Sequence, residues 1–183
     1  FTNLSPDHIG QSEHPDFENY KACKMRLFTE FGAETAIVNA DDNVANEILS
    51  ATTASRKITV STHKGADFVA SDVTPLRNER TLGVTFTASD NGVQATTELP
   101  LIGTMNAQNA LMAMAAAETC FEIPLPAAAH ALQNALVDGR SEVFTLSSGA
   151  SVIIDYAHNG TSLYHLLTTL REYQPQRLIV LFG

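Results

Sequence analysis

The chain has 183 residues, 44% hydrophobic and 17% charged, a composition that excludes a disordered or fibrous protein. Eleven Lys and Arg against 20 Asp and Glu give a net charge of -9, which argues against nucleic-acid binding through a basic surface. The longest purely apolar run, residues 110–117, is far shorter than the roughly 20 residues of a membrane span. We therefore expect a soluble, cytoplasmic protein whose cysteines, Cys23 and Cys120, are buried and reduced.

The first part of the chain alternates between helical and strand patterns. Apolar residues at helical spacing predict a helix over residues 16–31, opened by the polar segment that precedes it. A short strand over residues 35–39 follows. Residues 41–49 then read as a helix that starts at an Asp pair, and residues 57–60 read as the next strand. This order predicts a βαβ unit.

From residue 67 to residue 101 the period of the apolar pattern changes to two. The turn sequence of residues 90–92, Asp-Asn-Gly, lies between two alternating runs, residues 81–88 and 93–99. We predict an antiparallel ribbon inserted after the βαβ unit.

Two helices and a second α/β unit are predicted for the rest of the chain. An Ala-rich helix spans residues 106–121, and a second helix follows Pro124 and runs to about Val137. Beyond these, the pattern predicts two strands, a helix and a third strand, over residues 143–146, 152–156, 162–173 and 178–182. We expect one domain over residues 1–139 and the start of another over residues 140–183.

Both ends of the sequence suggest a piece of a longer chain. Residue 1 is Phe rather than Met, and the apolar run at the other end stops at the Gly where a strand would pass into a loop. No Gly-x-x-x-x-Gly-Lys-Ser/Thr phosphate loop occurs in the sequence.

Several stretches together resemble one known family. They include Asp155-Tyr-Ala-His-Asn159, the Gly139-Arg140 pair with Glu142, and a Gly-x-x-Asn-x-x-Asn-Ala segment that contains Asn106 and Asn109. Further matches cover residues 2–10, 13–20 and 23–28. In this order they resemble the Mur ligases, ATP-dependent enzymes that add amino acids to the peptide of the cell-wall precursor.

The resemblance implies an α/β fold: the carboxyl part of a central ATPase domain, mostly a parallel sheet with helices and a small antiparallel ribbon, followed by the start of a Rossmann-like domain. It implies ATP and Mg²⁺ as cofactors. The implied substrates are a UDP-N-acetylmuramoyl dipeptide and an amino acid, added as the third residue of the peptide. The branch that adds L-lysine is the most similar. A monomer without nucleic-acid or membrane partners is expected.

The resemblance also assigns a metal site. It implies that His8 supplies an imidazole to Mg²⁺ and that Lys24 carries a carbamate, an anion with the hard oxygen donors that magnesium prefers. The simpler interpretation of Lys24 is a solvated helix residue. Lys21 is the competing lysine, and we expect it to be a solvated neighbour.

A second group of residues suits a nucleotide. Asn106 and Asn109 lie three positions apart, so their carboxamides face the same way at the start of a helix, and by resemblance they contact adenine; the alternative for Asn106 is a helix cap. Arg140 offers a guanidinium for the terminal phosphate, and Asp155 offers a carboxylate for the ribose hydroxyls. His158 and Asn159 are loop residues that we expect to close on the nucleotide.

Three alternatives remain open. The enzyme could add meso-diaminopimelate in place of L-lysine. It could be a related ligase of the folylpolyglutamate synthetase type, or a non-catalytic nucleotide-binding relative. Because the phosphate loop lies outside this sequence, we expect the 183-residue chain to be inactive by itself.

Overall fold

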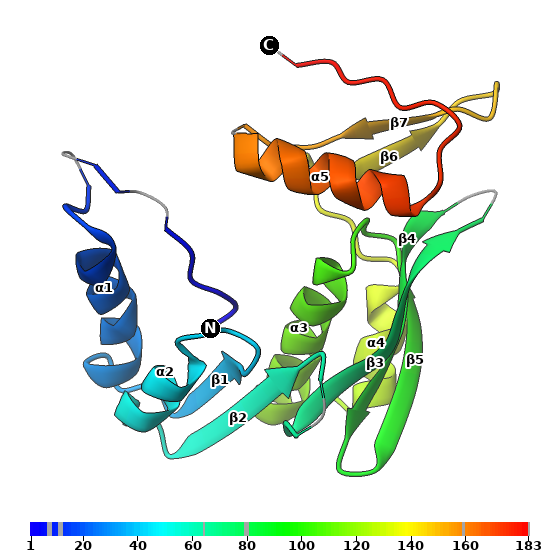
Figure 1. Cartoon of the computed structure of the whole chain (residues 1–183). Helices are drawn as coiled ribbons and strands as arrows, with labels where there is room; N and C mark the ends of the chain where they lie inside the picture. Colours follow the sequence, from blue (N-terminus) through cyan, green and yellow to red (C-terminus); the bar gives the residue numbers. More distant parts are fainter. Residues whose placement is uncertain (7–8, 11–12, 64, 79–80, 159, 183) are drawn as a thin grey trace.

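Figure 1 shows the computed structural model of the chain, which describes residues 1–6, 9–10, 13–63, 65–78, 81–158 and 160–182. The helices are α1 (Phe17–Thr29), α2 (Ala45–Ala51), α3 (Met105–Phe121), α4 (Leu125–Leu132) and α5 (Gly160–Glu172). The strands are β1 (Thr35–Asn39), β2 (Arg56–Ser61), β3 (Phe68–Arg77), β4 (Leu82–Asp90), β5 (Val93–Leu99), β6 (Glu142–Thr145) and β7 (Ser151–Ile154). The predicted α/β class is confirmed.

Five strands form one mixed sheet in the order of the chain, β1-β2-β3-β4-β5. The pairs β1–β2 and β2–β3 are parallel, whereas β3–β4 and β4–β5 are antiparallel. The predicted hairpin is confirmed, because Asp90 pairs with Val93 across a turn in which Asn91 and Gly92 both have positive φ. The ribbon is continuous with the parallel strands, since Val60 of β2 pairs with Phe68 of β3.

Helices cover both faces of the sheet at β1. On one face, Ala36 and Val38 pack with Phe28 of α1 and Ile48 of α2 in a small core. On the other face, Ile37 packs against the larger core, in which α3 and α4 lie against β2 to β5. The alternating burial along β1 therefore reflects two separate apolar layers, as expected for a parallel strand.

The last part of the chain forms a second, smaller unit. Strands β6 and β7 pair antiparallel, and α5 packs across them (Figure 1). A third apolar cluster, built on Ile102, Leu170 and Tyr173, joins this unit to the loop before α3. The boundary between residues 139 and 140 stays a prediction.

Three predicted elements differ from the structure. The helix expected over residues 41–49 begins only at Ala45, because the Asp42 side chain accepts the Val44 amide in a turn that precedes the helix. The helix expected to reach Val137 ends at Leu132, because the next amides donate to carbonyls three residues back, as the 3.0 Å bond from Ala135 to Leu132 shows. Residues 178–182 are extended but unpaired, because within the described chain β7 has only β6 as a neighbour. Leu181 and Phe182 are accordingly exposed.

The two cysteines are unpaired as predicted, but they are not buried. Both thiols are free, but Cys23 and Cys120 are exposed, so the expected burial is wrong. Each occupies an outward-facing position of its helix. Among the described residues, no helix is both long and apolar enough to cross a membrane.

Candidate functional site

Three of the predicted nucleotide residues gather in two adjoining loops beside β6 and β7. One carboxylate oxygen of Asp155 accepts hydrogen bonds from the amide (2.8 Å) and hydroxyl (3.0 Å) of Ser141, and the other accepts from the amide of Ala157 (2.9 Å). Arg140 lies over the ring of Tyr156, with its Cζ 5.1 Å from the ring centroid. Asp155 therefore fixes, through Ser141, the loop that contains Arg140.

His158 belongs to the same group. Its ring lies 5.0 Å from that of Tyr156, between centroids, and its Nδ1 is 3.1 Å from the Tyr156 carbonyl oxygen. Arg140, Tyr156 and His158 are all exposed, so a ligand can reach them. The arrangement offers a guanidinium and an imidazole on an aromatic surface, groups that suit a phosphate-bearing ligand.

The two asparagines form a second group at the start of α3. The Nδ2 of Asn106 donates to the Ile102 carbonyl at 2.8 Å, and the Nδ2 of Asn109 donates to Oδ1 of Asn106 at 3.2 Å. The N-cap residue is Thr104, so Asn106 does not cap the helix. The exposed Asn109 carboxamide is oriented by its partner, and its oxygen accepts no hydrogen bond from the described residues.

The lysines of α1 differ in their surroundings. Lys24 is exposed, with its Nζ 5.3 Å from the ring centroid of Tyr20. Lys21 forms ion pairs with Glu18 (2.9 Å) and with Glu47 of α2 (3.3 Å). The hydrogen bonds that its ammonium donates to these carboxylates, to Glu18 above all, raise the pKa of Lys21. The expectation that Lys21 is merely solvated is wrong, because it joins α1 to α2.

Two predicted site residues, His8 and Asn159, lie outside the described residues. In the described ranges, no cluster of three or more His, Cys, Asp or Glu side chains could hold a metal ion. Within the same ranges, no hydrogen bond or ring contact joins Lys24 to either nucleotide group. The accessible Lys24 amine is nevertheless compatible with a metal ligand formed by its modification, since both carbon dioxide and a cation can reach it.

Sequence reasoning missed one residue between the sheet and α3. Asp41 follows β1, and its carboxylate accepts hydrogen bonds from the hydroxyl of Ser61, from the amide and hydroxyl of Thr62 (2.7 and 2.8 Å), and from Nε2 of Gln108 (3.3 Å). Partial burial opposes ionisation, but the hydrogen bonds outweigh it and lower the pKa of Asp41. Its position directly after a buried strand was the available signal, although the Asp pair had suggested only a helix start.

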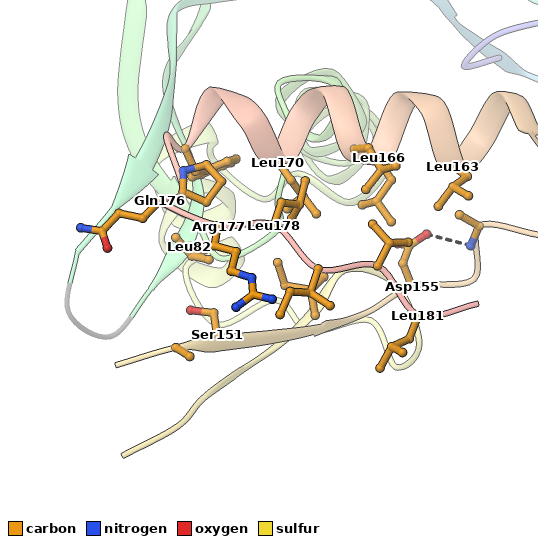
Figure 2. Close-up of a pocket in the computed structure, with 18 of the residues that line it drawn as sticks. Leu82, Ser151, Asp155, Leu163, Leu166, Leu170, Gln176, Arg177, Leu178 and Leu181 are labelled. Carbon is orange, nitrogen blue, oxygen red and sulfur yellow. Dashed lines mark hydrogen bonds between the residues drawn. The ribbon is translucent and has the colours of Figure 1, made fainter. Parts of the chain in front are cut away.

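A pocket of about 580 Å³ lies between α5, β7 and the residues that follow α5. Figure 2 shows Leu163, Leu166 and Leu170 of α5 pointing into it. Asp155 lies at one end, bonded to a backbone amide. The lining is mixed, because polar side chains that include Ser151 and Arg177 line the pocket together with the leucines.

The five-stranded sheet and the smaller unit after residue 139 define a two-part α/β protein with polar groups at strand and helix ends. The family model of the Mur ligase middle domain matches residues 1–117, and that of the Mur ligase, glutamate ligase domain matches residues 139–183. The chain belongs to the Mur ligase family.

The curated relatives include two kinds of ligase. A UDP-N-acetylmuramoyl-L-alanyl-D-glutamate–2,6-diaminopimelate ligase of Thermosynechococcus vestitus is 35% identical over 187 residues, covering 100% of this chain and 36% of its own length. A UDP-N-acetylmuramoyl-L-alanyl-D-glutamate–L-lysine ligase of Streptococcus thermophilus is 33% identical over 193 residues, covering 100% and 35%. The chain spans about a third of the length of these relatives.

Solved structures share the fold. A UDP-N-acetylmuramoyl-L-alanyl-D-glutamate–2,6-diaminopimelate ligase superposes with a TM-score of 0.76 and 28% identity, over 93% of this chain and 34% of that one. A folylpolyglutamate synthase of Mycobacterium tuberculosis, complexed with ADP and AMPPCP, gives a TM-score of 0.69 at 22% identity, over 92% and 37%. At this lower identity the likeness shows the fold alone.

Proposed function

We propose that this chain is part of an ATP-dependent ligase that adds the third amino acid to UDP-N-acetylmuramoyl-L-alanyl-D-glutamate in the cytoplasm. The observation that carries the proposal is the match over the whole chain to two relatives with this acceptor in their names. The exposed carboxamide, guanidinium and imidazole groups support it, because ATP presents a purine edge and phosphates to be bound.

In the proposed reaction, the γ-phosphoryl group of ATP passes to the substrate carboxylate and ADP leaves. The amine of the amino acid then attacks the acyl phosphate, which forms the amide and releases inorganic phosphate. Mg²⁺ would neutralise the negative charge of the phosphates and the carboxylate. We assign the metal to His8 and to Lys24 as its carbamate. Both assignments follow from the family resemblance.

The nucleotide roles follow from the two groups of side chains. Asn109, held by Asn106, presents a carboxamide to the adenine edge. Arg140 leaves the ring of Tyr156 to meet a phosphate, while His158 closes on the nucleotide from the same loop. Asn159 is assigned to the same closure.

Asp155 orders two loops and also suits a ribose hydroxyl. Its carboxylate orders the loop of Ser141 through one oxygen and the amide of Ala157 through the other. A carboxylate oxygen has more than one lone pair, so we propose that Asp155 also accepts a ribose hydroxyl while keeping these bonds.

We propose L-lysine as the added amino acid, with meso-diaminopimelate as the alternative. The test is a competition between the two amino acids in the full-length ligase, with ATP and the UDP-linked dipeptide. We expect L-lysine to be incorporated in excess. Preference for meso-diaminopimelate would reassign the amino acid, whereas ligation of glutamate to a folate would favour the folylpolyglutamate synthetase alternative. No ATP-dependent ligation at all would favour a non-catalytic nucleotide-binding relative.

A further inference from the structure

A buried tyrosine at the end of α5 ties the second unit of the chain to the sheet and to α3. Tyr173 is 5% exposed. Its hydroxyl donates to the Gly83 carbonyl of β4 and accepts from the Gly103 amide at 3.2 Å. A single oxygen atom thus satisfies backbone groups from two other parts of the fold.

The surroundings of this hydroxyl leave little freedom. Burial raises the pKa of Tyr173, so the hydroxyl keeps its proton and remains a donor. Gly103 has φ +103°, and a Cβ there would lie 3.1 Å from Cγ2 of Thr169 on α5. The glycine therefore permits the close approach of α5 to the turn before α3.

Arg77 holds the same end of α5 from another strand. Its Nη1 donates to the Tyr173 carbonyl at 2.6 Å and to the Gln174 carbonyl at 3.4 Å. Carbonyls at the end of a helix lack partners within the helix and favour a nearby cation. Strands β3 and β4 together fix where α5 ends.

The turn that Tyr173 holds is also the turn that orients Asn106. The Gly103 carbonyl accepts the Asn106 amide at 2.9 Å, and the neighbouring Ile102 carbonyl accepts the Asn106 side chain at 2.8 Å. Asn106 in turn accepts from Asn109. A continuous set of hydrogen bonds runs from the Tyr173 hydroxyl to the exposed carboxamide.

We propose that Tyr173 is a positioning residue for the nucleotide: by joining α5 to the Gly103 turn, it sets the Asn106–Asn109 pair relative to the loop of Asp155 and His158, which precedes α5. This inference rests on the proposed function, because it takes the Asn109 carboxamide, held by Asn106, as the adenine contact. Tyr173 itself touches no substrate. Its effect is transmitted through backbone groups at one end and through a helix at the other.

The test is Tyr173→Phe in the full-length ligase, which removes one oxygen atom and keeps the packed ring. Hydrogen exchange of the Gly103 amide should become at least about tenfold faster, because the amide loses its acceptor. The KM for ATP should rise about fivefold while kcat and the KM for the amino acid stay within about twofold. Tyr164→Phe is the matched control: Tyr164 is on the same helix, is 68% exposed, and should change neither readout.

The results distinguish a positioning role of Tyr173 from a purely structural one, and both from failure of the proposed function. Unchanged exchange at Gly103 in Tyr173→Phe would overturn the inference whatever the enzyme does. Faster exchange with an unchanged KM for ATP would also overturn it, leaving a purely structural joint. If the unmodified protein shows no ligation, the proposed function fails, and calorimetry with an ATP analogue then tests the positioning role through binding alone. Arg77→Gln, which loosens the same end of α5, should raise the KM for ATP in the same direction if Tyr173→Phe does not fold.

Discussion

Lys21 and Lys24 lie three residues apart in α1, yet their surroundings in the structure differ. Lys21 is held by carboxylates from two helices, so its ammonium is committed to packing α1 against α2. Lys24 is exposed, and the contact it makes with the described residues is with the face of Tyr20. A lysine that is to react with carbon dioxide and then bind a cation needs an accessible amine, and the amine of Lys21 is occupied by two carboxylates.

At this scale we predict that Lys24→Ala lowers the ligation rate of the full-length enzyme by about 10² to 10³, the effect of losing one electrostatic group at a reacting centre. A short carboxylic acid such as acetate should restore part of the rate, because it can replace the carbamate in the vacated space. Steady-state rates with and without the acid are the measurement.

The informative control for this prediction is Lys24→Arg. Arginine keeps the positive charge and the contact with the Tyr20 ring but cannot form the same carbamate. We expect it to be as slow as Lys24→Ala. A fully active Lys24→Arg enzyme would show that only a cation is required there. Lys21→Ala is unsuitable as a neutral control, because it breaks the pairs with Glu18 and Glu47.

Among the elements, those fixed by neighbouring residues could be predicted from the sequence. Asp16 caps α1 by accepting the Asn19 amide, and Asn91-Gly92 turns β4 into β5, so both elements are encoded within a few residues. The pairing of β2 with β3, which makes the ribbon part of the main sheet, depends on the path of the whole chain. No local pattern specifies it.

The candidate site likewise contains contacts that could be predicted from the sequence and contacts that could not. The contact between Asp155 and Ser141 lies within two loops that a family resemblance already singled out. Asp41 and Tyr173 were missed as site residues because their partners, Gln108 and Gly103, lie about 70 positions away in the sequence and become neighbours only after folding. Long-range hydrogen bonds of single polar groups leave no periodic signal.

At Gly83 of β4 the backbone of β5 leaves no room for a side chain. At Gly83, a Cβ would lie 2.1 Å from the Leu99 carbonyl oxygen, so any side chain forces β4 and β5 apart. Gly83→Ala should lower the free energy of unfolding by about 1–3 kcal/mol or more, measured by urea denaturation. Gly160→Ala is the matched control, since a Cβ at Gly160 meets nothing within 4 Å and alanine favours the helix. Equal stability of the two variants would contradict this reasoning.

For the whole molecule, we predict that the 183-residue chain binds ATP at least about tenfold more weakly than the full-length ligase and does not turn it over. Its candidate contacts address adenine, ribose and one phosphate edge, and its sequence has no phosphate loop for the remaining charges. Calorimetry of both proteins with Mg²⁺ and ATP measures the difference. Binding of equal strength by the short chain would mean that the phosphate loop contributes little.

Among the described residues, the hydrogen bonds that join the end of α5 to the sheet and to the Gly103 turn lie around Tyr173, and they give the second unit the mechanics of a lever. The fulcrum is Tyr173, and the 13 residues of α5 form an arm of about 20 Å. A rotation of about 10° at the fulcrum would carry the far end of the arm through about 3.5 Å, somewhat more than the length of a hydrogen bond. A small adjustment at Gly83 and Gly103 would thus be enlarged into making or breaking a contact at His158.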